Sequence, residues 1–230
     1  MKTYEHIFFD LDRTLWHFEE NSKKVLLDIF TDFGLNKHID LEDDFLSEYY
    51  KINEVLWERY RNNKITKDEL RSERFNLTLK HFNIDNVDMA TEMGHFYVNQ
   101  SPMQTILLPH TFDILNYLQA KYKLHIITNG FEEVQHIKLR ESKIGHFFDQ
   151  LIFSETVGVK KPHPLIFKKA MKNAGAKATN SIMIGDDYYA DIYGAQRVKM
   201  DSVYFNFNKV AHQHQTHHEI HCLSELKGLL

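Results

Sequence analysis

The segment His6-Ile-Phe-Phe-Asp-Leu-Asp-Arg-Thr-Leu15 sets an apolar run directly before two aspartates. The run Ile7-Phe8-Phe9 is typical of a strand buried on both faces, as in parallel sheets. Asp10 and Asp12 follow with one residue between them, so on an extended backbone both carboxylates point to the same side. Open α/β sheets bind ligands at the carboxyl ends of their strands. We therefore expect the two aspartates to line a binding crevice.

Two explanations fit this aspartate pair. Like charges in a partly buried cleft repel each other and lose hydration, at a cost of roughly several kcal/mol per ion. A bound cation or a shared proton would offset that cost. The alternative is structural: Asp12 caps a turn or a helix, with help from Thr14. Short patterns of this kind match often by chance, so the rest of the chain must decide.

The composition limits the class of protein. The chain has 230 residues, of which 43% are hydrophobic and 26% charged, which predicts an ordinary globular protein with one large domain or a domain carrying an insertion. The net charge of −4 offers no basic field, so nucleic acid is not an expected partner. The single cysteine, Cys222, excludes an intramolecular disulfide. No apolar run suits a membrane span or a signal peptide, so we expect no membrane partner and a cytoplasmic location.

Residues 16–102 are predicted to be helical almost throughout. Residues 66–69, Thr-Lys-Asp-Glu, have the capping-box pattern, and Leu70, Leu77 and Phe82 are expected on the buried face of the helix that follows. These features predict the core of a small helical bundle. Another apolar stripe recurs at three- and four-residue steps and comprises Phe45, Tyr49, Ile52, Leu56 and Tyr60.

From residue 109 onward, short apolar strands alternate with helices, which predicts a parallel sheet flanked by helices. The first strand belongs to the same sheet but is separated from its successors by about ninety residues, far more than a usual crossover. We therefore expect an α/β core formed by residues 1–15 and 103–230. Residues 16–102 are expected to form an inserted helical domain over the strand end that bears Asp10 and Asp12.

Polar residues follow the later strands at the positions where each strand ends. Thr128 is followed by Asn129 and a helix, and a hydroxyl with free backbone N–H groups can cradle a phosphate. Residues 160–161 add two lysines, and residues 185–191 place three carboxylates at a strand end and in the next helical turn. Each of these could also be a plain turn, a solvated loop, or a charge near a helix start, which is worth about 0.3–1 kcal/mol. Asp186 is the hardest to explain in that way.

The order Asp-x-Asp, Thr-Asn, Lys-Pro and Gly-Asp-x₄-Asp, each at a strand end, resembles the four motifs of the haloacid dehalogenase superfamily. The resemblance covers the whole chain. It implies a Rossmann-like three-layer sandwich with a parallel sheet, and a helical cap domain inserted between the first and second motifs. Members that cleave carbon–halogen bonds lack a carboxylate at the position of Asp12, so its presence implies phosphoryl transfer. Two departures, Arg13 in place of a frequent glycine and Val198-Lys199 in place of Ala-Gly, do not touch this chemistry.

The resemblance also implies catalytic roles. Asp10 would attack phosphorus and form an aspartyl-phosphate. Asp12 would protonate the leaving oxygen and then deprotonate the attacking water. Thr128, Asn129 and Lys161 would bind the substrate, with Thr128 and Lys161 on the phosphoryl oxygens.

Hard carboxylate oxygens with no thiol or imidazole nearby suit Mg²⁺ better than Zn²⁺. By the resemblance, the ion would be held by the carboxylates of Asp10 and Asp186 and by the backbone carbonyl of Asp12. Asp191 would support these ligands from behind. The role of Asp187 stays open.

The expected partner is a small phosphorylated substrate, and no feature fixes the oligomeric state. Several stretches resemble the bacterial pyrimidine 5′-nucleotidases, which dephosphorylate dUMP, UMP and dTMP. A sugar-phosphate or phosphoglycolate phosphatase, or a phosphomutase of the same fold, are the alternatives. From another class, a catalytically silent binding scaffold is also conceivable. The stretches that resemble the nucleotidases are residues 127–131 and 154–159 and, in the cap, Asn53, Leu56-Trp57, Tyr60 and Ile65-Thr66.

A histidine-rich tail allows two interpretations. Imidazoles at such spacings can hold Ni²⁺ or Zn²⁺, but a polar, solvated loop is the favoured interpretation. The residues concerned are His212, His214, His217, His218 and His221.

Overall fold

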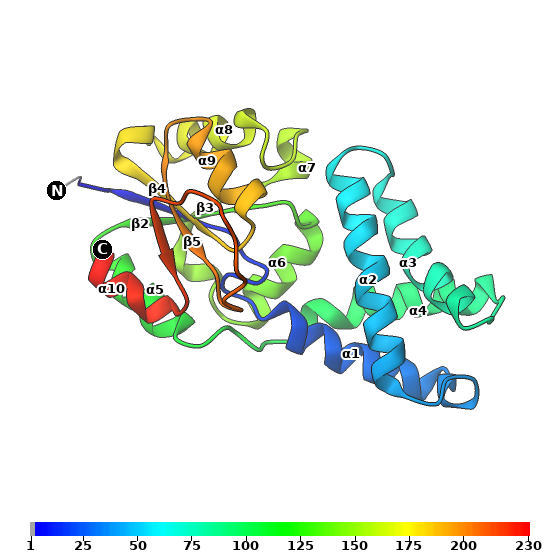
Figure 1. The fold of residues 1–230 in the computed structure, drawn as a ribbon. Helices are drawn as coiled ribbons and strands as arrows, with labels where there is room; N and C mark the ends of the chain where they lie inside the picture. The colour runs from blue at the N-terminus through cyan, green and yellow to red at the C-terminus, as the bar shows by residue number, and fades with distance from the viewer. Residues whose placement is uncertain (1–2) are drawn as a thin grey trace. The chain divides into compact units, whose positions relative to one another are not determined.

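The computed structural model describes residues 3–230, and the chain divides into two compact units. Unit 1 comprises Met1–Phe18 and Thr105–Leu230, and unit 2 comprises Glu19–Gln104 (Figure 1). The chain thus leaves unit 1 after its first strand and returns to it much later. That the helical unit acts as a cap stays a prediction.

Unit 1 is built on a parallel sheet whose strand order within residues 3–230 is β3-β2-β1-β4-β5-β6. The central strand β1 pairs with β2 on one side and β4 on the other, so that Phe9 lies opposite both Ile126 and Ile184. The strand order reverses at β1, and ligands bind open α/β sheets at such a switch point. The strands are β1 (His6–Phe9), β2 (Lys123–Thr128), β3 (Phe148–Phe153), β4 (Ser181–Gly185), β5 (Asp201–Phe205) and β6 (His218–Ile220).

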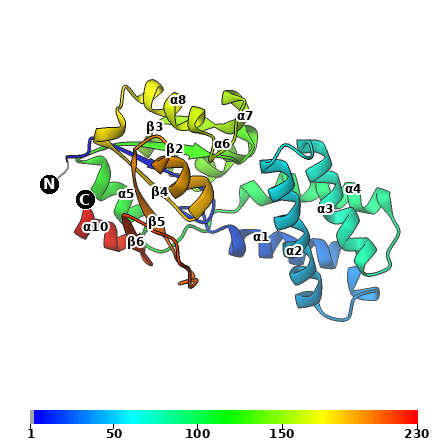
Figure 2. The same cartoon turned by 45° about the horizontal axis from the view of Figure 1, so that its top comes forward.

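Helices cover both faces of this sheet (Figures 1 and 2). Ile7 and Phe9 pack in the core that includes side chains of α5, α6 and α10, whereas Phe8 packs in the core formed with α8 and α9. All three residues of this run are fully buried, which confirms the strand and the three-layer α/β fold. The helices are α5 (Thr111–Gln119), α6 (Glu132–Glu141), α7 (Ser154–Val157), α8 (Pro164–Ala174), α9 (Gly194–Gln196) and α10 (Leu226–Leu229).

Two segments of unit 1 differ from the sequence-based expectation. The helix expected after β4 is a π-helical turn, η5 (Tyr188–Tyr193), followed by the short α9. Such widened turns often occur at functional sites. The tail expected as a solvated loop contains the edge strand β6, in which Ile220 is buried while His218 and Glu219 are exposed. Three residues are too few for a strand pattern to stand out in the sequence.

Unit 2 is helical, as the sequence predicts. Its helices are α1 (Phe18–Asp32), which begins at the last residue of the first segment of unit 1, α2 (Glu42–Arg61), α3 (Lys67–His81) and α4 (Val87–Gln100). Thr66 and Glu69 form the predicted capping box. The expectation for Leu77 is wrong, because its side chain is exposed while Phe75 and Leu79 are buried. Two residues correspond to 200° around a helix, so Leu77 faces away from both.

Candidate active site

The buried centre of unit 1 lies just beyond the end of β1. The backbone N–H of Asp10 donates to the carbonyl of Ile184, which continues the sheet by one residue. The ammonium of Lys161 lies 2.6 Å from Asp10 Oδ1 and 2.6 Å from Asp191 Oδ1. All three charged side chains are almost entirely shielded from solvent. The lysine therefore bridges two carboxylates in the interior.

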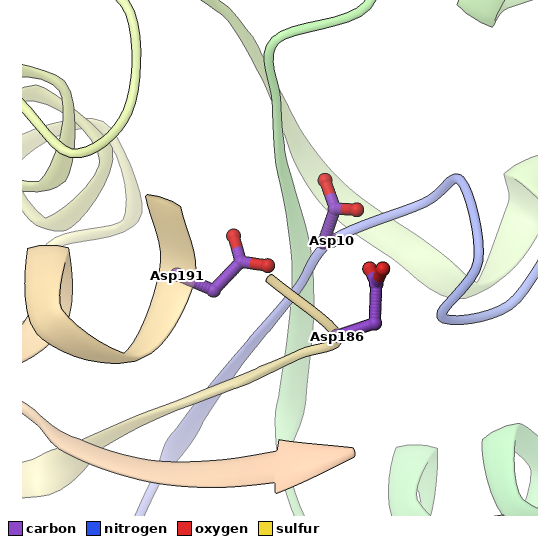
Figure 3. A group of neighbouring side chains, drawn as sticks. All are labelled: Asp10, Asp186 and Asp191. Carbon is purple, nitrogen blue, oxygen red and sulfur yellow. The ribbon is translucent and has the colours of Figure 1, made fainter. Parts of the chain in front are cut away.

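A third carboxylate completes the group. One oxygen each of Asp10, Asp186 and Asp191 lies within 4.8 Å of the others, and Figure 3 shows the three side chains turned toward a common space. They come from the end of β1, the end of β4 and η5. Thr14, considered from the sequence only as a helper in capping, donates its hydroxyl to Asp186 Oδ1 at 3.0 Å.

The backbone after β4 is shaped to bring Asp191 in. A Cβ at position 185 would lie 2.2 Å from Asp191 Oδ2, so only Gly185 leaves room for this carboxylate. Asp191 Oδ2 also accepts from the backbone N–H of Asp187 at 3.2 Å. The side chain of Asp187 instead accepts from the N–H of Ala190 at 2.9 Å and caps η5.

The electrostatics of this group favour a bound cation. Burial raises the pKa of Asp10 above its ordinary value, although Lys161 counteracts it. Burial and repulsion by Asp10 and Asp191 raise the pKa of Asp186 well above its ordinary value. Burial and repulsion by neighbouring carboxylates raise the pKa of Asp191 to about 7, although Lys161 counteracts them. Burial alone would lower the pKa of Lys161, but Asp10 and Asp191 together raise it. One lysine thus balances only part of the negative charge, a condition that a divalent ion relieves.

The donor set fits Mg²⁺. Among residues 3–230, the only group of three or more candidate metal-ligating side chains is the one formed by Asp10, Asp186 and Asp191. It offers carboxylate oxygens alone, which are the ligands that Mg²⁺ accepts in proteins. The tail histidines form no comparable group in the described part of the chain: His212 pairs with Glu219.

Thr128 and Lys161, the two candidates for binding the phosphoryl oxygens, lie on neighbouring loops, which Asn129 connects. Asn129 Oδ1 accepts from the backbone N–H of Lys161 at 2.7 Å, and Asn129 Nδ2 donates to its carbonyl at 3.1 Å. Asn129 therefore fixes the loop that carries Lys161. The hydroxyl oxygen of Thr128 accepts from the N–H of Gly130 at 3.0 Å and from Gln135 Nε2 at 2.8 Å.

Asp12 has two partners that sequence reasoning missed. Gln135 Nε2 donates to Asp12 Oδ2 at 2.7 Å, and the ammonium of Lys138 contacts Asp12 Oδ1 directly. Asp12 does not cap a helix, since α1 begins only at Phe18. The available signal was the spacing: Gln135, Lys138 and Leu139 share one face of α6, and all three are buried.

Comparisons with known proteins identify the family. The family model of haloacid dehalogenase-like hydrolases matches residues 4–199. YfnB of Bacillus subtilis, named as a HAD-hydrolase, is 30% identical over 90% of this chain and 86% of its own. Its crystal structure, described as bound to magnesium, has a TM-score of 0.89 at 28% identity and covers 99% of both chains.

Two further relatives carry more specific names. The pyrimidine 5′-nucleotidase YjjG of Escherichia coli is 30% identical over 88% of this chain and 86% of its own. A glyceraldehyde 3-phosphate phosphatase of Methanothermobacter thermautotrophicus is 30% identical over 87% of this chain and 84% of its own.

A parallel α/β sheet with an acidic, lysine-bridged centre at its switch point fits a hydrolase. The chain belongs to the haloacid dehalogenase-like hydrolase family. Within that family it is a hydrolase of phosphoric monoesters. No helix in residues 3–230 has the length and apolar character needed to cross a membrane.

Proposed function

We propose that this protein is a Mg²⁺-dependent phosphatase that works through an aspartyl-phosphate on Asp10 and acts as a 5′-nucleotidase on pyrimidine (deoxy)nucleoside monophosphates. The observation that carries the proposal is the convergence of three carboxylates and Lys161 beyond the end of β1. Gln135 joins the side chains of Thr128 and Asp12, two further proposed catalytic residues, to each other.

The metal ligands proposed are the carboxylates of Asp10 and Asp186 and the backbone carbonyl of Asp12. Asp191 supports them by holding Lys161. When bound, Mg²⁺ would supply positive charge that offsets the charge of the phosphoryl oxygens.

In the first step, a carboxylate oxygen of Asp10 attacks phosphorus and the bond from phosphorus to the ester oxygen breaks. The protonated carboxyl of Asp12 gives its proton to that oxygen, and an alcohol leaves. Thr128 and Lys161 donate hydrogen bonds to the phosphoryl oxygens throughout. Lys161 is suited to this because its charge is fixed in place by two carboxylates.

In the second step, the Asp12 carboxylate takes a proton from water, and the water oxygen attacks phosphorus. The bond between phosphorus and Asp10 breaks, which returns the Asp10 carboxylate and releases inorganic phosphate. Asp12 ends the cycle protonated, as it began. Asn129 takes part indirectly, through its two hydrogen bonds to the backbone of Lys161.

Unit 2 is proposed as the cap that selects the leaving group. The similarity to YjjG supports a nucleotide, and the similarity to the glyceraldehyde 3-phosphate phosphatase supports a sugar phosphate as the second candidate. A cytoplasmic location, expected from the composition, is part of the same proposal.

A substrate panel tests the nucleotidase assignment. The panel contains dUMP, UMP, dTMP, glyceraldehyde 3-phosphate, phosphoglycolate and a hexose phosphate, each with Mg²⁺. We expect the highest kcat/KM for a pyrimidine nucleotide. Equal or faster turnover of a sugar phosphate or of phosphoglycolate would contradict the nucleotidase assignment and leave the phosphatase chemistry intact.

Asp10→Asn separates an enzyme from a silent scaffold. The wild type should release phosphate from a generic ester with Mg²⁺, and the variant should lose on the order of a thousandfold or more of that rate. Equal rates in both proteins would assign the activity to a contaminant or to another site.

A further inference from the structure

Helix α6 contributes two side chains that none of the proposed catalytic steps uses. Gln135 is fully buried and Lys138 is 5% exposed, although both are long polar residues. Such residues are rarely buried without a partner. Here the partner is the same for both: Gln135 binds one oxygen of the Asp12 carboxylate and Lys138 binds the other.

Lys138 is held on more than one side. Its ammonium lies 4.1 Å from the centre of the indole ring of Trp16, which is fully buried. A cation over an aromatic face is attracted to it, more strongly when both are shielded from water. The ring therefore restricts the ammonium to the side on which it meets Asp12. Trp16, which the sequence assigned to the helical insertion, belongs to unit 1.

Gln135 ties Asp12 to the phosphoryl-binding Thr128. Its Nε2 donates to Asp12 Oδ2 at 2.7 Å and to the Thr128 hydroxyl at 2.8 Å. The amide reaches this position only because residue 130 is glycine, since a Cβ there would lie 2.1 Å from Gln135 Nε2. The absence of a side chain at Gly130, in the turn after β2, thus provides the space that the Gln135 amide occupies.

The double contact also orients the Thr128 hydroxyl. Its oxygen accepts from the N–H of Gly130 and from Gln135, so both of its acceptor positions are used. The structure records no acceptor for its own proton among residues 3–230. That proton is left for an incoming acceptor such as a phosphoryl oxygen.

We propose that Gln135 and Lys138 are positioning residues, which fix the orientation of the Asp12 carboxylate for proton transfer and the donor direction of the Thr128 hydroxyl. The inference rests on the proposed role of Asp12. Each carboxylate oxygen has about two acceptor positions. One partner on each oxygen therefore fixes the plane of the group and leaves a position free for the substrate or for water.

The leaving group provides a readout that a merely structural role would not move. An alkoxide such as the 5′ oxygen of dUMP departs with a proton from Asp12, whereas 2,4-dinitrophenolate is a weak base and departs without one. Misplacing Asp12 should therefore slow the first ester selectively. The value of kcat/KM reports this first step, in which the alcohol or the phenolate leaves.

The experiment compares kcat/KM for dUMP and for 2,4-dinitrophenyl phosphate in wild type, Lys138→Met and Asp12→Asn. We expect Lys138→Met to lose about tenfold to a hundredfold with dUMP and less than about threefold with the dinitrophenyl ester. Lys138→Arg retains the positive charge and should recover part of the loss. Arg140→Met is the matched control, because Arg140 lies on the same helix and pairs with Glu141 at the surface; both of its values should stay at the wild-type level.

The outcomes separate the inference from the proposed function. If Asp12→Asn shows the selective loss and Lys138→Met does not, the inference is overturned and the proposed role of Asp12 stands. Equal losses of both esters in Lys138→Met would likewise overturn it and leave a structural role. If Asp12→Asn itself shows no selectivity, Asp12 is not the acid and both fail.

A second variant covers the case in which Lys138→Met does not fold. Gln135→Met removes the donor to Asp12 Oδ2 and keeps a similar volume. It should slow both esters, because Thr128 also loses a partner, but dUMP more than the dinitrophenyl ester. The same loss for both would overturn the inference.

Discussion

At the residue scale, the ammonium of Lys161 lies between two buried carboxylates in a centre that contains three. Removing one partner of a buried ion pair leaves an uncompensated charge in the interior, and this costs more than the intact pair contributes. Lys161 therefore has two functions in the proposed enzyme. It binds the phosphoryl group, and in the ligand-free protein its positive charge offsets part of the negative charge of the buried carboxylates.

Lys161→Met should therefore destabilise the metal-free protein by about 3–5 kcal/mol. Mg²⁺ should restore part of that loss, because a ligand that binds only the folded state stabilises it by mass action. Urea unfolding with and without Mg²⁺ measures both effects. In the control Lys168→Met, at an exposed position on α8, we expect a change within about 0.5 kcal/mol. A Lys161→Met protein as stable as the wild type in chelator would contradict this account.

The residues at the strand ends could be predicted because each follows a recognisable strand. Asp10, Thr128, Lys161 and Asp186 all occupy such positions, and the structure places Asp10, Lys161 and Asp186 at one centre. Gln135 could not be found in this way. The spacing of Gln135, Lys138 and Leu139 indicates a shared helix face, but the contact of Gln135 with Asp12 joins residues 123 positions apart, and that spacing does not identify Asp12 as the partner.

At the scale of single elements, the start of α3 is secured by the capping box. Thr66 Oγ1 accepts from the N–H of Glu69 at 3.2 Å, and Glu69 Oε2 accepts from the N–H of Thr66 at 2.7 Å. Thr66→Ala should lower the free energy of unfolding by about 1 kcal/mol. Thermal unfolding measures this, and Thr91→Ala, a hydroxyl on α4 that bonds only its own helix, is the control. An unchanged free energy of unfolding in Thr66→Ala would mean that the capping box does not stabilise the first turn of α3.

Two buried histidines lie side by side on the paired strands β1 and β2. His6 Nδ1 and His125 Nε2 lie 3.0 Å apart in the interior. Burial and the neighbouring His6 lower the pKa of His125 from its usual 6.5 to about 4, against the opposing charge of Asp149. Burial and Lys123 also lower the pKa of His6, against Glu5 and Asp149.

This pair predicts a loss of stability in acid. Between pH 6.5 and 4 the unfolded chain binds a proton at His125 that the folded chain excludes, so stability is fully present above this range and falls as the pH decreases through it. The measurement is urea unfolding across that range. His125→Asn should show a shallower decline, whatever its absolute stability. The exposed-strand control His218→Asn should decline as the wild type does, and equal slopes in all three proteins would refute the assignment.

Element types followed from sequence periodicity wherever the elements were long. The π-helical turn η5 (Tyr188–Tyr193) did not, because six residues are too few for a departure from the 3.6-residue period to show in the sequence. The edge strand β6 was missed because it has three residues.

At the scale of the whole molecule, the proposed division of labour assigns the chemistry to unit 1 and the choice of leaving group to unit 2. Trp57 is a half-buried aromatic on α2, and its ring lies 5.6 Å from that of Tyr60 in an edge-on arrangement. An aromatic side chain that stacks on a base contributes about 1–3 kcal/mol.

On the proposal that unit 2 selects a nucleotide, and with Trp57 as the candidate that stacks on its base, Trp57→Ala should lower kcat/KM for dUMP by about tenfold or more while leaving p-nitrophenyl phosphate within about threefold. Steady-state assays of both esters check this, and Val55→Ala, an exposed position on the same helix, is the control. Equal losses with both esters would indicate damage to the fold, and no loss with either would remove Trp57 from base recognition.

The two points at which the chain leaves and re-enters unit 1 lie side by side. Leu108 N–H donates to the carbonyl of Leu15 at 2.9 Å, and His17 N–H donates to the carbonyl of Ile106 at 3.0 Å. These hydrogen bonds hold the two chain segments together within unit 1, so the inserted residues 19–104 begin and end at neighbouring points. Doubling the length of such a loop costs only about 0.6 kcal/mol. On the proposal that unit 2 selects the leaving group, replacement of residues 19–104 by another insert should change the substrate preference and leave the residues of the proposed active site in unit 1 in place.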